Sequence, residues 1–222
     1  MVTVALDVDP DRARPFIAAA EPTHPSLIDT THATDDLFGF TNVPMAVWID
    51  EGGVIVRPAE HASVERNRLR DIEIPDGLPE RMRTMLGEVK KLPEHAPEYR
   101  AAVEDWVDRG ADSAFALSPA EVVARSGDRP PEHARAAACF ELGQHLWRTV
   151  GEVAAIPWWK EAHALFPENW TYKRQAWTIA TTAEDAPAPD LIQEAGEVYG
   201  TTWLDDVLRL GGGSRYYPEL DL

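Results

Sequence analysis

The pattern of hydrophobic positions predicts β-strands in the first part of the chain. Apolar and β-branched residues fill 2–8 almost without a break, and two further runs cover 45–49 and 54–56. A continuous run such as 2–8 is typical of a strand that is buried on both faces, as at the centre of a parallel sheet. The other two runs flank a turn at 50–53 that contains two glycines, and this arrangement predicts a β-hairpin.

The segments between these runs predict helices and one more strand. Asp9 is a candidate N-cap for a helix over 10–20, and Pro15 inside that stretch predicts a kink or a later helix start. A short strand is expected over 25–29, followed by a short helix before the hairpin. The order strand, helix, strand, helix and hairpin predicts an α/β fold for residues 1–60.

From Glu80 onward, the hydrophobic residues recur at the spacing of helices. Ser118 begins a capping box, with a proline at the first helical position and a glutamate at the third. Further helices are expected over 130–150, 152–166, 168–182 and 189–209. Seven of the eight tryptophans lie beyond residue 100, which predicts dense aromatic packing in this half of the chain.

A polar stretch separates the two halves. Residues 61–78 carry few apolar side chains and include proline and glycine, so we interpret them as a linker. The predicted organisation is therefore an α/β domain over 1–60, a linker over 61–78 and an all-helical domain over 79–222, with helix predominating overall.

The predicted hairpin carries a pattern that resembles a known family. Gly39, Val43-Pro44, Trp48 to Asp50 and Gly53 to Ile55 are similar to the second half of a thioredoxin-like domain, of the TlpA/ResA or AhpC/TSA redoxin branch. The resemblance covers roughly residues 1–60. It implies that the peptide bond before Pro44 is cis, a geometry that X–Pro bonds adopt at low cost.

The same resemblance implies a substrate-binding role for Val43, Pro44 and Met45, which would face a Cys-x-x-Cys motif across the active site. Most members of the family have threonine where this chain has Met45, so one contact residue departs from the pattern. The family function that the resemblance implies is thiol–disulfide oxidoreduction.

This chain does not contain the redox motif of that family. Its one cysteine is Cys139, in a predicted helix, where a buried structural thiol is expected. Thiol–disulfide exchange needs a low-pKa thiolate and usually a second sulfur. We therefore expect no catalytic residue and no redox activity in the chain as given. Two explanations stay open: a natural half-domain, or an internal start at Met1 of a protein that begins upstream.

The helical half resembles a tetratricopeptide (TPR) repeat. The matching positions are Leu142, Gly143, Leu146, Ala155, Trp159, Ala162 and Pro167, at the spacing of a helix–turn–helix unit of about 34 residues. Gly143 and Ala155 would let two helices approach closely, while Leu146 replaces the usual tyrosine. The resemblance implies a surface that binds peptides or proteins, and the alternative is a plain helical bundle.

Aromatic and basic residues in this region are candidates for partner binding. They are Trp158, Tyr172, Lys173, Arg174 and Trp177. By helical phase, one of the neighbouring tryptophans at 158 and 159 belongs in the core, and the other could line a groove for an acidic or aromatic peptide. The competing interpretation is that all of them pack in the core.

Charge and composition narrow the classes of partner. The net charge is −17 and the pI about 4.7, so the chain should repel nucleic acid and anionic membrane surfaces. No apolar run approaches the roughly 20 residues of a membrane helix, and no signal-peptide pattern is visible, which predicts a cytoplasmic protein. The seven histidines show no metal-ligand spacing, so neither a metal nor a cofactor is expected.

The sequence therefore predicts a truncated thioredoxin-like protein with a TPR-like interaction domain, redox-inactive as given. The alternative is a non-catalytic adaptor that works through its helical half. A third hypothesis is homo-oligomerisation, since strands missing from the sheet would leave an open edge that a second copy could pair with.

Overall fold

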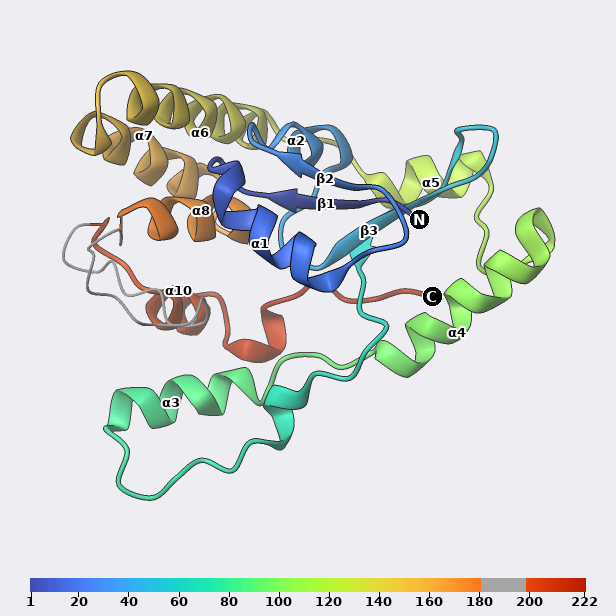
Figure 1. Cartoon of the computed structure of the whole chain (residues 1–222), viewed down its shortest axis with the longest axis horizontal. Helices are drawn as coiled ribbons and strands as arrows, with labels where there is room; N and C mark the ends of the chain where they lie inside the picture. The colour runs from blue at the N-terminus through green and yellow to red at the C-terminus, as the bar shows by residue number, and fades with distance from the viewer. Residues whose placement is uncertain (181–198) are drawn as a thin grey trace. The chain divides into compact units, whose positions relative to one another are not determined.

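The computed structural model describes residues 1–180 and 199–222, and it is mostly helical with two small sheets. The described residues form two compact units. Figure 1 labels most of their helices and strands. Unit 1 comprises Met1–Thr41 and Arg129–Tyr199, and unit 2 comprises Asn42–Asp128 and Gly200–Leu222. A mixed α/β and helical class, as predicted, is confirmed at this level.

Unit 1 opens with a parallel β-α-β segment. Strand β1 (Thr3–Leu6) pairs in parallel with β2 (Ser26–Asp29), and helix α1 (Pro10–Ala20) connects them. The predicted N-cap is confirmed, because the Asp9 side chain accepts a hydrogen bond from the backbone N–H of Asp11. The helix begins at Pro10 with Pro15 inside it, so the predicted later start is wrong.

The predicted burial of the first strand on both faces is wrong. None of the residues of β1 is fully buried, and Val2 and Val4 are exposed. In the described residues β1 has one hydrogen-bonded neighbour, β2, so this sheet has two strands and no centre. The first buried residue of this apolar run is Val8, which lies after the end of β1.

A layer of helices completes unit 1. The short helix α2 (Ala33–Phe38) ends at Gly39, whose positive φ of 76° gives a left-handed C-cap. The three longer helices are α6 (Pro131–Thr149), α7 (Glu152–Leu165) and α8 (Trp170–Ala180), which lie within the predicted helical ranges. Figure 1 shows α6 and α7 side by side and antiparallel.

The pairing of α6 with α7 depends on the glycine that the TPR-like pattern singled out. A Cβ added at Gly143 would lie 2.5 Å from two ring atoms of Trp159. Trp159, Ala155 and Ala162 have no exposed surface. Gly143 leaves room for the indole of Trp159, and Ala155 is buried in the same helix pair, so the two helices approach closely at these small residues, as the pattern predicted.

Contacts distant in sequence join the first strands to these helices. The Val8 N–H donates to the Gln175 side chain at 3.1 Å, and the Trp170 N–H donates to the Thr41 carbonyl at 2.6 Å. Helices α6 to α8 therefore group with residues 1–41. This division differs from the predicted one, in which 1–60 and 79–222 form separate domains.

Unit 2 contains the predicted hairpin. Strands β3 (Met45–Ile49) and β4 (Ile55–His61) pair antiparallel, with Met45 opposite His61 and Ile49 opposite Ile55. In the turn, the Asp50 carboxylate accepts hydrogen bonds from the N–H groups of Gly52 and Val54 at 2.8 and 2.9 Å. The hairpin is confirmed, and the Val43-Pro44 peptide bond is cis.

The helices of unit 2 come from two stretches of the chain, one after the hairpin and one near the end of the sequence. They are η1 (Arg68–Asp71), α3 (Glu80–Val89), α4 (Ala96–Arg109), η2 (Gly110–Asp112), α5 (Pro119–Ser126), α10 (Trp203–Arg209) and η3 (Gly213–Arg215). The capping box predicted at Ser118 is formed, with both of its hydrogen bonds to Glu121 present. The predicted helix over 189–209 lies partly outside the described residues, and its described end is α10.

The segment predicted as a linker is attached to unit 2 at several points. Strand β4 extends to His61, the first linker residue. The Asn67 N–H donates to the Glu94 carboxylate at 2.8 Å, and the Arg100 guanidinium donates to the Val64 carbonyl at 2.6 Å. In the described ranges, no helix is long and apolar enough to cross a membrane.

Candidate functional site

The residues predicted to contact substrate lie at the entry to β3. Val43 and Pro44 are exposed and Met45 is half-buried. The Pro44 carbonyl accepts a hydrogen bond from the Ala62 N–H at 3.1 Å, which continues the hairpin ladder beyond Met45 and His61. The structure therefore brings the three residues together on the surface of unit 2, and their role as substrate contacts stays a prediction.

Beside this entry point, Asn42 is fully buried and makes two hydrogen bonds. Its Oδ1 accepts from the Val43 N–H at 2.9 Å, and its Nδ2 donates to the main-chain carbonyl of Tyr216 at 2.8 Å. One amide side chain thus holds the start of β3 and a segment 174 positions further along the chain.

Arg57 is the most connected polar residue of the hairpin, and its side chain is 1% exposed. Its guanidinium donates to both carboxylate oxygens of Glu60, with a shortest distance of 2.9 Å. It also donates to the carbonyls of Phe115 at 3.0 Å and Asp221 at 2.6 Å. Burial raises the pKa of Glu60, and the adjacent Arg57 opposes that shift. Arg57 therefore ties β4 to two other segments of unit 2.

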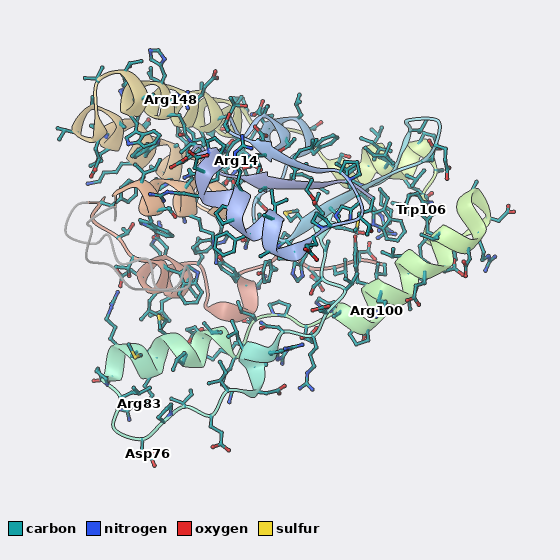
Figure 2. The ribbon with its side chains drawn as sticks, in the orientation of Figure 1. Arg14, Asp76, Arg83, Arg100, Trp106 and Arg148 are labelled. Atoms are coloured by element: carbon teal, nitrogen blue, oxygen red, sulfur yellow. The ribbon has the colours of Figure 1, made fainter. Side chains whose placement is uncertain are left out.

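An aromatic cluster lies next to this guanidinium. Arg57 lies 5.3 Å from the ring centroid of Trp48, which stacks on Trp106 at 5.0 Å and donates its indole N–H to the Tyr99 hydroxyl at 2.7 Å. Burial raises the pKa of Tyr99 to about 12. Trp106 comes from α4, where Figure 2 labels it together with Arg100. The partly buried Leu220 packs against this cluster.

His61 forms the other side of the hairpin surface. Its ring stacks on the ring of Tyr217, with centroids 3.8 Å apart and planes inclined by 15°. The Tyr217 hydroxyl donates to the Val43 carbonyl at 3.2 Å. Burial, together with the charge of His95, lowers the pKa of His61 to about 4, so the ring is neutral at pH 7.

Sequence analysis missed a second polar cluster, which lies in unit 1 where β2 ends. Asp29 accepts hydrogen bonds from the backbone N–H and hydroxyl groups of Thr31 and Thr34, at 2.8 to 3.0 Å. Burial alone would raise the pKa of Asp29, but these four bonds outweigh it and lower the pKa to about 2. Asp29 is therefore ionised throughout the neutral range.

Two further side chains of this cluster bury polar atoms that have no hydrogen-bond partner in the described residues. His32 is 3% exposed with no partner for Nδ1, and Asp35 is 2% exposed with no partner for either carboxylate oxygen. The Thr171 hydroxyl is close enough to lower the pKa of Asp35, but it donates to the Asn169 side chain at 2.6 Å. Burial lowers the pKa of His32 to about 4 and raises that of Asp35 to about 7.

One feature of the sequence could have indicated this cluster. Asp29 ends a predicted strand and His32 and Asp35 lie in the next six residues, and the carboxyl ends of parallel strands are where α/β folds place ligands. The sequence pattern did not place this segment against the later helices: the His32 ring packs edge-on against Phe140 of α6, and Thr171 at the start of α8 lies near Asp35. The cluster has no metal-binding arrangement: among residues 1–180 and 199–222, no group of three or more His, Cys, Asp and Glu side chains could hold a metal ion.

The raised pKa of Asp35 predicts how the stability of the folded chain depends on pH. Because its folded pKa lies above the unfolded value of 3.8, the folded state should lose stability as the pH rises from about 4 to 7, and the loss is complete above 7. Asp35→Asn should remove this loss and stabilise the chain at pH 8 by about 1–2 kcal/mol, with no gain at pH 4. Urea denaturation at both pH values measures the difference.

A matched control for this prediction is Asp11→Asn, which alters a carboxylate 88% exposed on the surface of the same unit. It should change stability by less than about 0.5 kcal/mol at either pH. A gain for Asp35→Asn that is equal at pH 4 and pH 8 would contradict a titrating Asp35.

The residues predicted to bind a partner are mostly in the core. Tyr172, Lys173 and Trp177 are buried, Arg174 is half-buried and Trp158 is 39% exposed. The predicted split between neighbouring tryptophans is confirmed, since Trp159 is fully buried. The groove lined by an exposed aromatic and two basic side chains is not formed, because α8 presents this face to the interior of unit 1.

The burial of Lys173 explains why a basic groove fails to form. Its Nζ donates to the carbonyl of Pro167 and lies 4.4 Å from the ring centroid of Trp170. The Lys173 ammonium group therefore has its partners inside unit 1 and is not available to an acidic peptide. Tyr172 likewise stacks on Phe140 at 4.2 Å.

Cys139 is buried in α6 with 6% of its surface exposed, as predicted for a structural thiol. It belongs to unit 1, whereas Val43, Pro44 and Met45 belong to unit 2. No protein-family model matches the chain, and comparisons with curated proteins and with solved structures give no match either.

Proposed function

We propose that this chain is an interaction protein that binds another protein through helix α7 and, by itself, catalyses no thiol–disulfide exchange. The observation that carries the proposal is the contrast between the two sides of α7. Its inner side is fully buried at Ala155, Trp159 and Ala162, while its outer side exposes Val153, Pro157 and Trp158. In this proposal the thioredoxin-like residues 1–60 are part of the scaffold.

The outer side of α7 has the composition of a protein-binding surface. Val153 is 87% exposed, and Pro157 lies four positions further on, on the same side of the helix. Trp158 follows directly, and Val150 is exposed at the turn before α7. Apolar side chains exposed together are costly in water, and tryptophan is enriched among residues that dominate binding energy.

The close approach of α6 and α7 would keep this surface rigid. Because Gly143 contacts the ring of Trp159, the register of α7 on α6 is fixed, and with it the direction of the exposed side chains. A preformed surface loses less conformational entropy on binding than a mobile one. This rigidity supports the TPR-like interpretation of the pair, which remains part of the proposal.

The absence of redox activity rests on the state of the thiol. A catalytic thiol must reach a disulfide on another molecule as a thiolate. Cys139 is buried, and the chain contains no second cysteine. We expect dithiothreitol-coupled reduction of insulin to proceed at the rate without protein. The control is Cys139→Ser, and turnover that this variant abolishes would contradict the proposal.

The interaction itself can be tested by placing a photo-crosslinking amino acid at position 158 of the full chain in the cells that produce it. A crosslinked partner should appear, and Val153→Asp should reduce its yield about tenfold or more. Val107→Asp is the matched control, since Val107 is also an exposed helical valine but lies in unit 2. Crosslinking that is equal in both variants would contradict binding through α7.

A second candidate is thiol–disulfide oxidoreduction in which another polypeptide segment supplies the sulfur groups. The exposure of Val43 and Pro44 favours it, because these are the residues that the resemblance assigns to the substrate. The genomic sequence before Met1 distinguishes the two candidates. In-frame codons for a Cys-x-x-Cys or equivalent motif would favour the enzyme, and their absence would favour the interaction protein.

A further inference from the structure

Residues 216–222 of unit 2, here called the strap, lie along the hairpin without forming a helix or strand. Three side chains from the rest of unit 2 donate hydrogen bonds to main-chain carbonyls of the strap. Asn42 bonds the Tyr216 carbonyl at 2.8 Å, and Arg57 and Arg125 both bond the Asp221 carbonyl at 2.6 Å. The strap is thus held at both ends through its backbone.

Recognition of this kind does not depend on the sequence of the strap. A main-chain carbonyl is offered by every polypeptide, and side-chain donors aimed at such carbonyls will accept any chain that follows the same path. The donors belong to elements outside the strap: Asn42 precedes β3, Arg57 lies in β4 and Arg125 lies in the last turn of α5. They form a fixed set around the strap.

Two side chains of the strap add specificity. The ring of Tyr217 stacks on His61, and its hydroxyl donates to the Val43 carbonyl at 3.2 Å. Leu220, three positions later, packs against the cluster of Trp48, Tyr99 and Ala102. Backbone hydrogen bonds combined with side-chain anchors are a common way in which proteins bind an extended peptide.

A third feature concerns charge. The Asp221 carboxylate lies 3.3 Å from the Arg125 guanidinium, so an acidic residue directly after the aliphatic anchor is favoured. The Asp221 side chain is 80% exposed, and Pro218 and Glu219 are exposed as well. Between its anchors, therefore, the strap is only lightly held, which is the condition for local opening without unfolding of the whole unit.

We propose that the surface formed by Asn42, Arg57, His61 and Arg125 binds an extended, acidic polypeptide segment, and that the strap occupies this surface as an internal ligand. The partner segment would carry an aromatic residue, an aliphatic residue three positions later and an acidic residue next to it. Such a partner competes with the strap. The inference is independent of the surface on α7, which belongs to unit 1.

The test uses the full chain with a weakened strap, Tyr217→Ala/Leu220→Ala, and a fluorescent synthetic peptide with the sequence of residues 214–222. Fluorescence anisotropy should show binding to this variant about tenfold tighter than to the unaltered chain, where the strap competes. A peptide with the same two residues changed to alanine should not bind. Failure of the unchanged peptide to bind a variant that still unfolds cooperatively would overturn the proposal.

Added to the weakened-strap variant, Arg125→Gln should lower peptide affinity about fivefold or more, because it removes the donor to the Asp221 carbonyl and the charge beside its carboxylate. Arg66→Gln is the matched control, since Arg66 is an exposed arginine of the same unit whose guanidinium pairs with Asp71 at 2.7 Å. Equal affinity in the two variants would overturn the assignment of Arg125.

Hydrogen exchange measures the opening of the strap in the unaltered chain, so it tests the proposal even if the weakened-strap variant does not fold. The amides of residues 219–222 should exchange through local opening, at least about tenfold faster than the slowest amides of α4, and excess peptide should accelerate them further by competing for the surface. Strap amides as protected as those of α4 would show that the strap is a fixed part of the core, and would overturn the proposal.

Discussion

Replacing Arg57 by alanine is expected to lower the free energy of unfolding by about 3–5 kcal/mol. The substitution removes hydrogen bonds to Glu60, to the Phe115 carbonyl and to the Asp221 carbonyl. It also removes the larger of the two arginine charges, Arg57 and Arg125, that oppose the rise in the pKa of the buried Glu60 carboxylate. An uncompensated buried charge is the main reason for a loss of this size.

Two further substitutions separate charge from geometry. Arg57→Lys keeps the positive charge but cannot reproduce the forked set of donors, so an intermediate loss is expected. Arg66→Ala removes an exposed arginine that pairs with Asp71 and should cost less than about 1 kcal/mol. Urea denaturation followed by circular dichroism measures all three. If Arg57→Ala costs no more than Arg66→Ala, the buried network does not stabilise the hairpin.

Replacing Gly143 by alanine is expected to destabilise the chain by up to about 3 kcal/mol, although alanine is the better helix former. The added Cβ would lie 2.5 Å from Cδ1 and Nε1 of Trp159, closer than real Cβ contacts. Trp159 is fully buried and cannot move into solvent. Helices α6 and α7 would have to separate, and the packing between them would be lost.

Gly87 provides a matched control, because it also lies inside a helix, in α3, but an added Cβ would meet nothing within 4 Å. Gly87→Ala should therefore stabilise the chain by about 0.5–1 kcal/mol. The two substitutions are chemically identical and opposite in expected sign, so thermal denaturation of both distinguishes close helix approach from helix propensity. A stabilising Gly143→Ala would contradict the close packing of α6 on α7.

Local sequence patterns predicted the local structure well. The hairpin, the caps at Asp9 and Ser118, and the close approach of two helices at Gly143 all depend on residues close in sequence or on helical periodicity. Turn and cap preferences arise from backbone geometry and from hydrogen bonds to neighbouring N–H groups. These forces act within a few residues, so the sequence alone reports them.

Local patterns did not show which faces of the elements are buried, because burial depends on contacts formed in the tertiary structure. Lys173 looks like a surface residue in sequence, yet it lies in the core because the Pro167 carbonyl and the Trp170 ring satisfy its charge. The first strand looks fully buried in sequence, yet in the described residues it has one neighbour. In both cases the outcome depends on partners that hydropathy does not identify.

The amino-acid sequence by itself determined the elements, their caps and the single buried thiol of this protein. Only the tertiary structure decided that β1 and β2 group with α6 to α8, that Arg57 is a buried centre of hydrogen bonds, and that residues 216–222 lie along the hairpin. The Val8–Gln175 bond joins residues 167 positions apart. Such contacts are selected by the shape and charge of the whole chain once it has folded, and no local pattern encodes them.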